Sequence, residues 1–541
     1  DVLRAGLLLL LAICCTSSAY GQAVYGSIGG TVVDSSGGGV ANAQVTITDM
    51  DRNIVYTTPT NAAGNYDQRH LIVGHYRVQV EAAGFKTVVS EVDVAVDSRM
   101  TFDVTLQPGD VKQTITVTDE APLLKTERTD VSTTLTEQQV TQLPTWGRNF
   151  SNLLLLTPGA VQFCWGDTST ENPQGGIAVN VNGQMFVGDA SILDGTDNRD
   201  FLYGNMLIVP SLDSVVEMKV TSAVPDAEFG QVSAAVITTS TKSGTNDFHG
   251  EGLWFRRNDA MEARNPFSES IPDPITGKYI PATLWNQFGG SVGGPVIKDK
   301  AFFFIDYQGT RAKDGGSATA RVPTAAERNG DFSVLAAATG QNIYNPYDAS
   351  GNLLANPSLR TQFAGNVIPT GMISTAAQNL LKYIPLPNIN QTDPTLPNYS
   401  GGASDIYNGD AITGRADYFY SDNLRFFDRY TYTQFVKQAP GLFGAIAGGP
   451  QLNQLGYTGS GDTRPQSNSF GFDKTLSPTL LVDFRFGWYK QRINVDPLAN
   501  GDYATQAGAV GLNIPTDPLT NNMPHFSIQG QGGFDFGNGL Y

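Results

Sequence analysis

Charge, cysteine and long apolar runs are all scarce in this sequence of 541 residues. Charged residues make up 16%, and 51 acidic against 34 basic side chains give a net charge of −17. Binding to nucleic acid needs a basic footprint, so this balance argues against such a partner. Beyond the first residues, no stretch approaches the ~18–20 apolar residues that a transmembrane helix needs. If the protein enters a membrane, it must therefore cross it as a β-barrel.

Residues for the common catalytic and metal-binding motifs are also scarce. Only Cys164 lies outside the N-terminal apolar segment, which excludes a disulfide framework and a cysteine metal site. None of the four histidines has the i, i+4 partner of a zinc-hydrolase helix. Lys242-Ser243-Gly244 and Ser421-Asp422-Asn423 resemble pieces of penicillin-recognising serine enzymes, but their order is reversed and the nucleophile motif is missing. We expect no enzyme, no cofactor and no metal site.

The first 21 residues have the composition of a secretory signal. Arg4 precedes an apolar run over 7–13, and small or polar residues follow up to Ala19-Tyr20-Gly21. A basic start, a short apolar core and small residues at −3 and −1 are typical of a cleaved signal peptide. We expect cleavage after Gly21, the alternative being a buried N-terminal helix. Because the first residue is Asp1 and not Met, we also expect the gene product to begin further upstream.

Residues 24–107 have the pattern of a small β-sandwich. Glycine-containing turns separate short runs in which polar and apolar residues alternate; in one of them Tyr76, Val78 and Val80 share a face. Short alternating strands at this spacing predict two packed sheets. The predicted strands are 27–33, 43–49, 54–58, 76–82, 88–94 and 100–106.

The same segment contains four short motifs at the turns and strand starts: Gly30-Thr31-Val32-Val33-Asp34, Gly64-Asn65-Tyr66, Gly74-His75-Tyr76-Arg77-Val78 and Ala83-Gly84-Phe85-Lys86. With these motifs it resembles the carboxypeptidase regulatory-like domain. This resemblance implies no peptidase activity. The fold is of a kind grouped with carbohydrate-binding modules, but here we expect a structural spacer.

Residues 108–120 are predicted to be a linker that carries a β-prone segment without an obvious partner strand. Such a segment can add to an exposed sheet edge of another protein, because backbone hydrogen bonds supply the affinity. The candidate residues are Gln113, Thr114, Ile115, Thr116, Val117 and Thr118. They resemble a TonB box, which implies the inner-membrane energy-coupling protein TonB as a partner. The alternatives are the last strand of the sandwich or a plain linker.

Residues 121–245 are predicted to combine short helices with strands. Thr136 and Gln139 have the spacing of a capping box, and Pro144 ends that helix. A second short helix over 148–156 ends at Thr157-Pro158-Gly159. Strands are predicted at 177–181, 191–193, 214–221 and 234–239.

The order of motifs in this segment resembles the plug domain of TonB-dependent outer-membrane receptors of the Oar-like type. The central motif runs from Leu193 to Asn198, and its candidate plug-loop residues are Asp194, Gly195, Asp197 and Asn198. Together with Asp189 and Asp200 the two aspartates could bind calcium, which takes several oxygen ligands. Their spacing fits no known calcium loop, so we expect a solvated plug loop. The other matching motifs are Leu143-Pro144, Gly147-Arg148-Asn149, Leu156-Thr157-Pro158-Gly159, Pro210-Ser211-Leu212-Asp213-Ser214-Val215, Glu217-Met218-Lys219-Val220, Ala227-Glu228-Phe229-Gly230, Thr241-Lys242-Ser243-Gly244-Thr245-Asn246 and Phe248-His249-Gly250.

Residues 246–541 are predicted to be the first strands of a transmembrane barrel. In the run 479–490, Leu480, Val482, Phe484, Phe486 and Trp488 share one face, opposite Asp483, Arg485 and Gly487. An apolar lipid face and a polar lumen face are typical of such strands, the alternative being a soluble antiparallel sheet. A stretch rich in Pro, Asn and Gly at about 312–411 is predicted to be an extracellular loop. About seven candidate strands follow 246, whereas large plugged transporters have roughly 22, so we expect a truncated barrel.

The predicted fold is therefore mainly β: a small β-sandwich, an α+β plug and part of a large transmembrane antiparallel barrel. By resemblance to TonB-dependent receptors, the expected function is energised passage of a ligand through the outer membrane of a two-membrane bacterium. The expected partners are TonB, outer-membrane lipid and an unidentified ligand, with oligosaccharide, peptide and metal chelate left open. The alternative is a surface adhesin or carbohydrate- or matrix-binding protein without transport.

Overall fold

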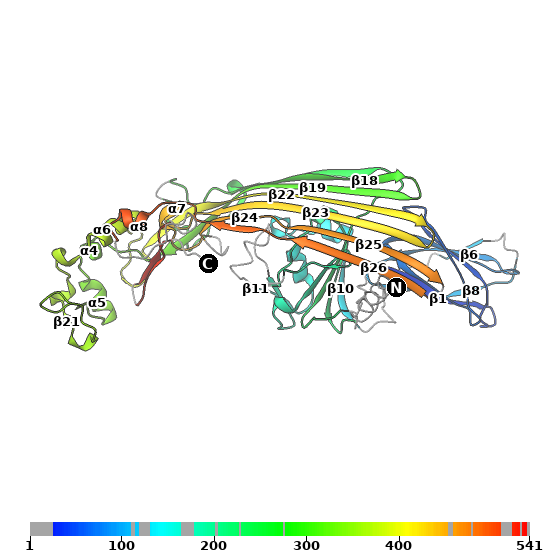
Figure 1. The fold of residues 1–541 in the computed structure, drawn as a ribbon, viewed down its shortest axis with the longest axis horizontal. Helices are drawn as coiled ribbons and strands as arrows, with labels where there is room; N and C mark the ends of the chain where they lie inside the picture. The colour runs from blue at the N-terminus through cyan, green and yellow to red at the C-terminus, as the bar shows by residue number, and fades with distance from the viewer. Residues whose placement is uncertain are drawn as a thin grey trace, which may run out of the picture.

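The computed structural model of the chain contains a small β-sandwich, an inner module and a long curved sheet (Figure 1). It describes residues 25–109, 114–117, 130–163, 178–200, 204–226, 229–273, 276–452, 458–477, 480–509, 522–530 and 533–537. The predicted signal segment, Gln113 and Thr118 lie outside the described residues. The mainly β fold agrees with the sequence prediction.

The sandwich consists of two sheets that enclose one apolar core. One sheet has the order β4-β1-β7, with β8 also paired to β1, and the other has the order β3-β2-β5-β6-β9. Tyr76, Val78 and Val80 are fully buried between them, as the alternation of their strand predicts. The strands are β1 (Gly26–Asp34), β2 (Gln44–Asp49), β3 (Val55–Pro59), β4 (Asn65–Leu71), β5 (Gly74–Glu81), β6 (Thr87–Val94), β7 (Arg99–Thr101), β8 (Val104–Leu106) and β9 (Thr114–Val117).

Strand β4 is the element of the sandwich that sequence reasoning missed. The motif Gly64-Asn65-Tyr66 begins in a turn, but only Gly64 belongs to that turn, and its φ of +81° suits glycine. The strand begins with the next residue and pairs antiparallel with β1, where Thr31 lies opposite Asn65. The polar run from Asp67 to His70 lacks the alternation of apolar residues that predicts a strand, because these side chains face the outside of the sandwich or its neighbours.

The inner module has a five-stranded sheet of order β10-β15-β16-β13-β14 and lies against one face of the curved sheet (Figure 1). Thr136 caps helix α2, and the predicted capping box with Gln139 is formed. Val140, Phe150 and Met218 belong to its apolar core. The elements are β10 (Val131–Thr136), α2 (Glu137–Gln142), η1 (Trp146–Arg148), η2 (Phe150–Leu156), β11 (Ala160–Phe163), β12 (Ala178–Val181), η3 (Phe186–Gly188), β13 (Ala190–Leu193), β14 (Thr196–Asp197), η4 (Leu212–Ser214), β15 (Val215–Ala223) and β16 (Val236–Thr241).

The curved sheet has nine strands, and neighbours along it are antiparallel. The order is β17-β18-β19-β22-β23-β24-β27, and β25 pairs with both β23 and β26. These strands arch over the inner module, with the sandwich at one end of them (Figure 1). The strands are β17 (His249–Asn258), β18 (Leu284–Ile297), β19 (Ala301–Ala320), β22 (Tyr399–Ser421), β23 (Leu424–Ala439), β24 (Gly459–Thr463), β25 (Gln466–Ser477), β26 (Leu480–Lys490) and β27 (Ile493–Asp496).

The two faces of the curved sheet differ in polarity, as the sequence predicts. Asp483 and Arg485 of β26 turn inward, and their side chains are only 15% and 8% exposed. The apolar side chains of the same strand point outward and are 38–54% exposed. An outward apolar face on strands of this length suits contact with lipid chains. The outward residues are Leu480, Val482, Phe484, Phe486 and Trp488.

The connection between β19 and β22 is shorter than the predicted loop at about 312–411. The two strands pair continuously from Ala301 opposite Tyr418 to Ala320 opposite Tyr399, so the true connection is 321–398. Small and polar residues dominate the extended strand ends and show no apolar alternation, which is why they read as loop. Backbone pairing does not require that alternation.

Short elements, most of them in this connection, occupy the end opposite the sandwich (Figure 1). No helix in the described part of the chain is long and apolar enough to cross a bilayer. The elements are η5 (Asp259–Met261), α4 (Ala325–Arg328), α5 (Ser333–Thr339), β20 (Tyr344–Asn345), η6 (Pro357–Leu359), β21 (Thr361–Gln362), η7 (Ala364–Asn366), η8 (Thr370–Met372), α6 (Thr375–Leu380), η9 (Leu381–Tyr383), α7 (Gly444–Ala447), α8 (Tyr503–Gln506), β28 (Phe526–Ile528) and β29 (Phe534–Phe536).

A charge on the outward face should be costly. Phe484 lies in the middle of β26 with its side chain 43% exposed. We expect Phe484→Arg to lower the free energy of unfolding in phospholipid vesicles by about 2–4 kcal/mol, since arginine would enter the hydrocarbon region. Phe484→Leu should change it far less. Urea unfolding in vesicles measures both, and equal stability of the two variants would contradict a lipid-facing β26.

Candidate functional site

The predicted plug-loop motif forms a tight hairpin at the tip of the inner module. Asp194 and Gly195 connect β13 to β14, with Leu193 opposite Thr196. Both turn residues have positive φ, +49° at Asp194 and +81° at Gly195. An Asp-Gly pair is favoured in two-residue hairpin turns for this reason. The hairpin directs the Asp194 side chain toward the curved sheet.

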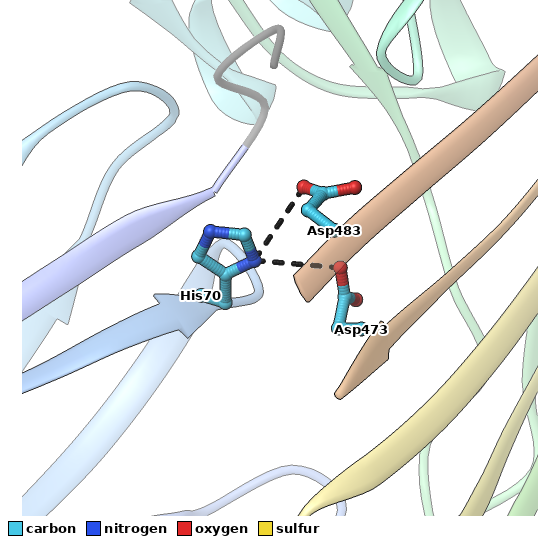
Figure 2. Close-up of side chains that lie close together, drawn as sticks. All are labelled: His70, Asp473 and Asp483. Carbon is cyan, nitrogen blue, oxygen red and sulfur yellow. Dashed lines mark hydrogen bonds and ion pairs between the residues drawn. The ribbon is translucent and has the colours of Figure 1, made fainter. Parts of the chain in front are cut away.

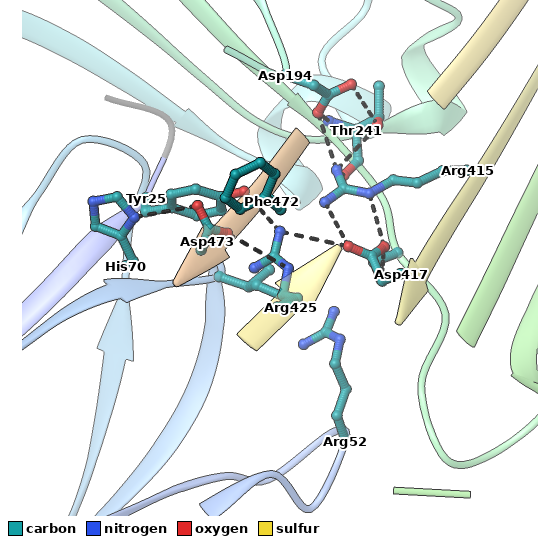
Figure 3. A network of polar contacts seen from close by, with 12 residues as sticks. Tyr25, Arg52, His70, Asp194, Thr241, Arg415, Asp417, Arg425, Phe472 and Asp473 are labelled. Carbon is teal, nitrogen blue, oxygen red and sulfur yellow. Dashed lines mark hydrogen bonds and ion pairs between the residues drawn. The ribbon is translucent and has the colours of Figure 1, made fainter. Parts of the chain in front are cut away.

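Asp194 binds two arginines of the curved sheet in a buried environment. Its Oδ1 accepts a hydrogen bond from Nη1 of Arg415 (3.0 Å), and its Oδ2 accepts one from Nε of Arg429 (3.2 Å). The backbone N–H and the hydroxyl of Thr241 each donate to the same carboxylate at 2.9 Å. The side chains of Asp194 and Arg429 are 3% and 1% exposed. Figure 3 shows the carboxylate facing Arg415 and Thr241.

The contact continues as a chain of alternating charges along the inner face of the sheet. Arg415 also donates to Asp417 (2.9 Å), which accepts a hydrogen bond from the hydroxyl of Ser243 in the inner module (2.7 Å). Arg425 lies between Asp417 and Asp473 (Figure 3). The carboxylates and guanidinium groups balance, which lowers the cost of burying them. We call this the charge network; its members are Asp194, Asp417, Asp473, Asp483, Arg415, Arg425, Arg429 and Arg485.

The sandwich reaches the same network through Tyr25 and His70. The hydroxyl of Tyr25 accepts a hydrogen bond from Nη2 of Arg425 (2.7 Å), and its ring lies against Arg425 and Arg485. Burial raises the pKa of Tyr25 well above its usual range, although Arg425 opposes this effect. The tyrosine is therefore a neutral acceptor at any physiological pH.

His70, Asp473 and Asp483 form the one cluster in the described part of the chain with a metal-ligand composition (Figure 2). Nδ1 of His70 lies 3.4 Å from Oδ1 of Asp473 and 3.5 Å from Oδ2 of Asp483. Arg485, however, contacts both carboxylates, at 2.7 and 2.5 Å. The guanidinium group of Arg485 already neutralises the two carboxylates that would bind a cation. We therefore interpret this cluster as a contact between the sandwich and the sheet.

The other candidate plug-loop residues have separate environments. Asn198 is buried and holds the hairpin base, donating to the carbonyl of Ile208 (2.8 Å) and accepting from its N–H (2.9 Å). Asp197 pairs with Arg199 and its side chain is 43% exposed.

The prediction that these four aspartates lie in a solvated loop is therefore wrong for three of them. Asp189, Asp194 and Asp200 are buried, and each binds different groups. Burial raises the pKa of Asp189 to about 7, although a hydrogen bond from Ala235 opposes it. Among the described residues, these carboxylates do not come together in a cluster that could hold a metal ion, which argues against the calcium site that their composition suggested.

The described part of the TonB-box candidate is the last strand of the sandwich, which was one of the two alternatives to a TonB box. Thr114–Val117 is strand β9 at the edge of the five-stranded sandwich sheet, parallel to β6, with Ile115 opposite Val88. Among the described residues no strand pairs with its other edge. An edge strand can still accept a strand from another protein, so this position and a TonB-box role are compatible.

Comparison with known proteins adds a family and several relatives. Residues 240–540 match the family described as outer membrane beta barrel domain, and residues 27–107 match the carboxypeptidase regulatory-like domain. The TonB-dependent transporter Oar of Myxococcus xanthus is 25% identical over 301 residues, which cover 53% of this chain and 27% of that protein. The chain thus spans about a quarter of the length of this curated relative.

Two solved structures resemble parts of the chain. The outer membrane transporter YddB from Escherichia coli is 12% identical, with 66% of this chain and 38% of that chain covered and a TM-score of 0.41. The ferric enterobactin receptor from Pseudomonas aeruginosa is 11% identical, with 67% and 41% covered and a TM-score of 0.39.

Proposed function

This chain belongs to the outer membrane beta barrel domain family, and from that premise we propose that it is a TonB-dependent transporter. In this proposal the curved sheet is part of the barrel wall in the outer membrane, and the inner module is the plug that closes the barrel. TonB in the inner membrane supplies the energy for passage of a ligand. The identity with the transporter Oar supports the assignment.

The observation that carries the proposal is the buried contact between Asp194 of the inner module and Arg415 and Arg429 of the wall. A dry ion pair holds strongly because removing one partner leaves an uncompensated buried charge. The same pair loses most of its strength once water enters, because the Coulomb energy falls steeply with dielectric constant. Such a contact suits a plug that must stay closed at rest and open when displaced.

We propose β9 as the element on which TonB acts. A strand of TonB would pair with the edge of β9 that faces away from β6, through backbone hydrogen bonds, as in other cases of strand addition. This mode of binding depends on the backbone more than on particular side chains. It therefore suits a segment in which threonine alternates with isoleucine and valine, all of them β-branched residues that favour strands. The sandwich end of the barrel would then face the periplasm, and the connection over 321–398 would lie at the external entrance for the ligand.

Energy-dependent exposure of the plug tests this function without a known ligand. Thr238 is buried in β16 of the inner module and is 2% exposed. We expect Thr238→Cys, in a full-length protein with Cys164→Ser, to react with a membrane-impermeant maleimide in energised cells that contain TonB. Deletion of TonB or an uncoupler should suppress the reaction. A surface adhesin predicts the same low labelling in all these cells, and that outcome would overturn the proposal.

A further inference from the structure

The sandwich is attached to the inner module by buried polar contacts. Nζ of Lys219 on β15 lies 2.5 Å from Oδ2 of Asp97 in the sandwich and 3.1 Å from Oδ2 of Asp130. All three side chains are 3–4% exposed. Next to them, the backbone N–H of Val96 donates to Oε2 of Glu217 at 2.5 Å. Separating these groups would leave buried charges without the partners that now compensate them, which costs much free energy.

The sandwich also contacts the barrel wall, but by a different kind of interface. Ile54 and Ile72 of the sandwich pack against Phe302 and Phe419 of β19 and β22. At the edge of this apolar patch, Nδ2 of Asn53 donates to Oδ1 of Asp299, 3.2 Å away and exposed to solvent. Apolar contacts are non-directional and exposed hydrogen bonds exchange with water. The sandwich also meets the charge network of the wall through Tyr25 and His70. Arg425 and Arg485, however, keep counter-charges at Asp417, Asp473 and Asp483 within the wall itself. This interface can therefore open without leaving a wall charge unpaired.

The connections of the chain favour the same asymmetry. Strand β9 pairs with β6 of the sandwich, and the chain continues from β9 to β10 of the inner module. A pull on β9 therefore acts directly on the sandwich sheet, through the backbone hydrogen bonds between β9 and β6. The sandwich passes it on through the Asp97–Lys219 contact.

We propose that the sandwich transmits the force from TonB to the plug. In this movement it separates from the barrel wall while remaining attached to the plug. The contact around Asn53 and Asp299 is then an interlock: as long as it is closed, the plug cannot move. This inference rests on the proposed function, because it concerns how a TonB-driven displacement reaches the inner module. It gives the N-terminal domain a mechanical role in place of the spacer role expected from the sequence.

A reversible crosslink across the interlock tests the inference in the full-length protein in cells. Asn53→Cys with Asp299→Cys, joined by a reducible bifunctional thiosulfonate, ties the sandwich to the wall. The matched control joins Lys300→Cys to Ser421→Cys, two wall positions beside the hydrogen bond between the N–H of Phe419 and the carbonyl of Lys300. Both pairs are placed in the Cys164→Ser, Thr238→Cys background described above, and energised labelling of position 238 is the readout.

The inference predicts that the sandwich–wall crosslink reduces labelling at position 238 to the level of de-energised cells, and that reductant restores it. The wall–wall crosslink should leave labelling unchanged. Before crosslinking, energised labelling should not fall in either cysteine pair, because loss of the hydrogen bond between Asn53 and Asp299 cannot hold the interlock closed. Undiminished labelling with the sandwich tied to the wall would overturn the inference and leave the transport function standing. Absence of energy-dependent labelling in every variant, including the uncrosslinked protein, would overturn the transport function and this inference together.

Discussion

Replacing Asp194 by alanine is expected to lower the free energy of unfolding by about 3–5 kcal/mol, the usual cost of removing one partner of a buried ion pair. Arg415 would keep Asp417 as a counter-charge. The remaining side-chain hydrogen bonds of Arg429 to described residues go to the uncharged hydroxyls of Thr431 and Ser467. The guanidinium group of Arg429 is almost completely buried, so water cannot replace the lost carboxylate without opening the contact. Urea unfolding of the protein in detergent measures the change.

Asp197→Ala is the matched control for this prediction. Asp197 lies three residues away in the same motif, but its side chain is 43% exposed and pairs only locally with Arg199. An exposed pair contributes at most about 1 kcal/mol, so the control variant should unfold close to the wild type. Equal destabilisation by Asp194→Ala and Asp197→Ala would contradict the assignment of Asp194 to a plug–wall contact.

A double substitution separates the ion pair from other effects of the alanine. Arg429→Met removes the charge that Asp194→Ala would strand, and replacing both partners of a buried pair costs much less than replacing one. We therefore expect the double variant to be more stable than Asp194→Ala alone, with a coupling energy of about 0.5–3 kcal/mol between the sites. Additive losses would show that the two side chains do not depend on each other.

The second large effect is expected at β9. Ile115→Pro should abolish binding of the periplasmic domain of TonB and the energised labelling of Thr238→Cys, because proline lacks the N–H and has a fixed φ that added strands do not tolerate. Ile115→Ala should do much less, since it keeps the backbone donor. Titration of the purified TonB domain against each purified variant measures the binding directly.

The pairing of β9 with β6 makes a second measurement necessary. Ile115 lies opposite Val88, so proline could also weaken the edge of the sandwich sheet. The core of the sandwich lies between the other strands, with Tyr76 and Leu106 fully buried, and we expect it to stay folded without β9. Protease resistance of the sandwich in the Ile115→Pro receptor tests this. Loss of the folded sandwich would assign β9 a structural role; normal TonB binding would remove its coupling role.

The sequence predicts local features of this fold well. The capping box at Thr136 and the inward face of Tyr76, Val78 and Val80 follow from residues a few positions apart, and the structure contains both. The outward apolar face of β26 follows in the same way from period-two alternation. These predictions succeed because each depends on the geometry of a single element.

The candidate site was predictable only in part, because its partners are far apart in the chain. The motif at Asp194 was identified, but Arg415 lies 221 residues later, and no local pattern links the two. Alternation places Arg415 on the polar face of its strand without naming what it meets. Asp428 and Arg429, which interrupt an apolar alternation, were the available signal: Arg429 points inward to Asp194 and Asp428 does not.

The position of β9 shows a similar limit. Its composition indicates a strand, and both a TonB box and a last sandwich strand were consistent with it. Strand pairing is decided by which sheet edge is within reach after folding, and that depends on the whole sandwich. The structure adds that one edge of this strand is occupied by β6, and sequence alone could not choose that partner.

The central claim, that TonB engages this chain at β9 to move the plug, is tested most directly by crosslinking in living cells. A photoreactive amino acid at position 117 of the full-length protein is activated with and without an uncoupler, and adducts are identified by mass spectrometry. A matched position on β3, at the opposite edge of the same sheet, is the control. The account predicts an adduct with TonB from position 117 and none from β3. The contradicting result is the absence of a TonB adduct from position 117 in cells where TonB does crosslink to another receptor.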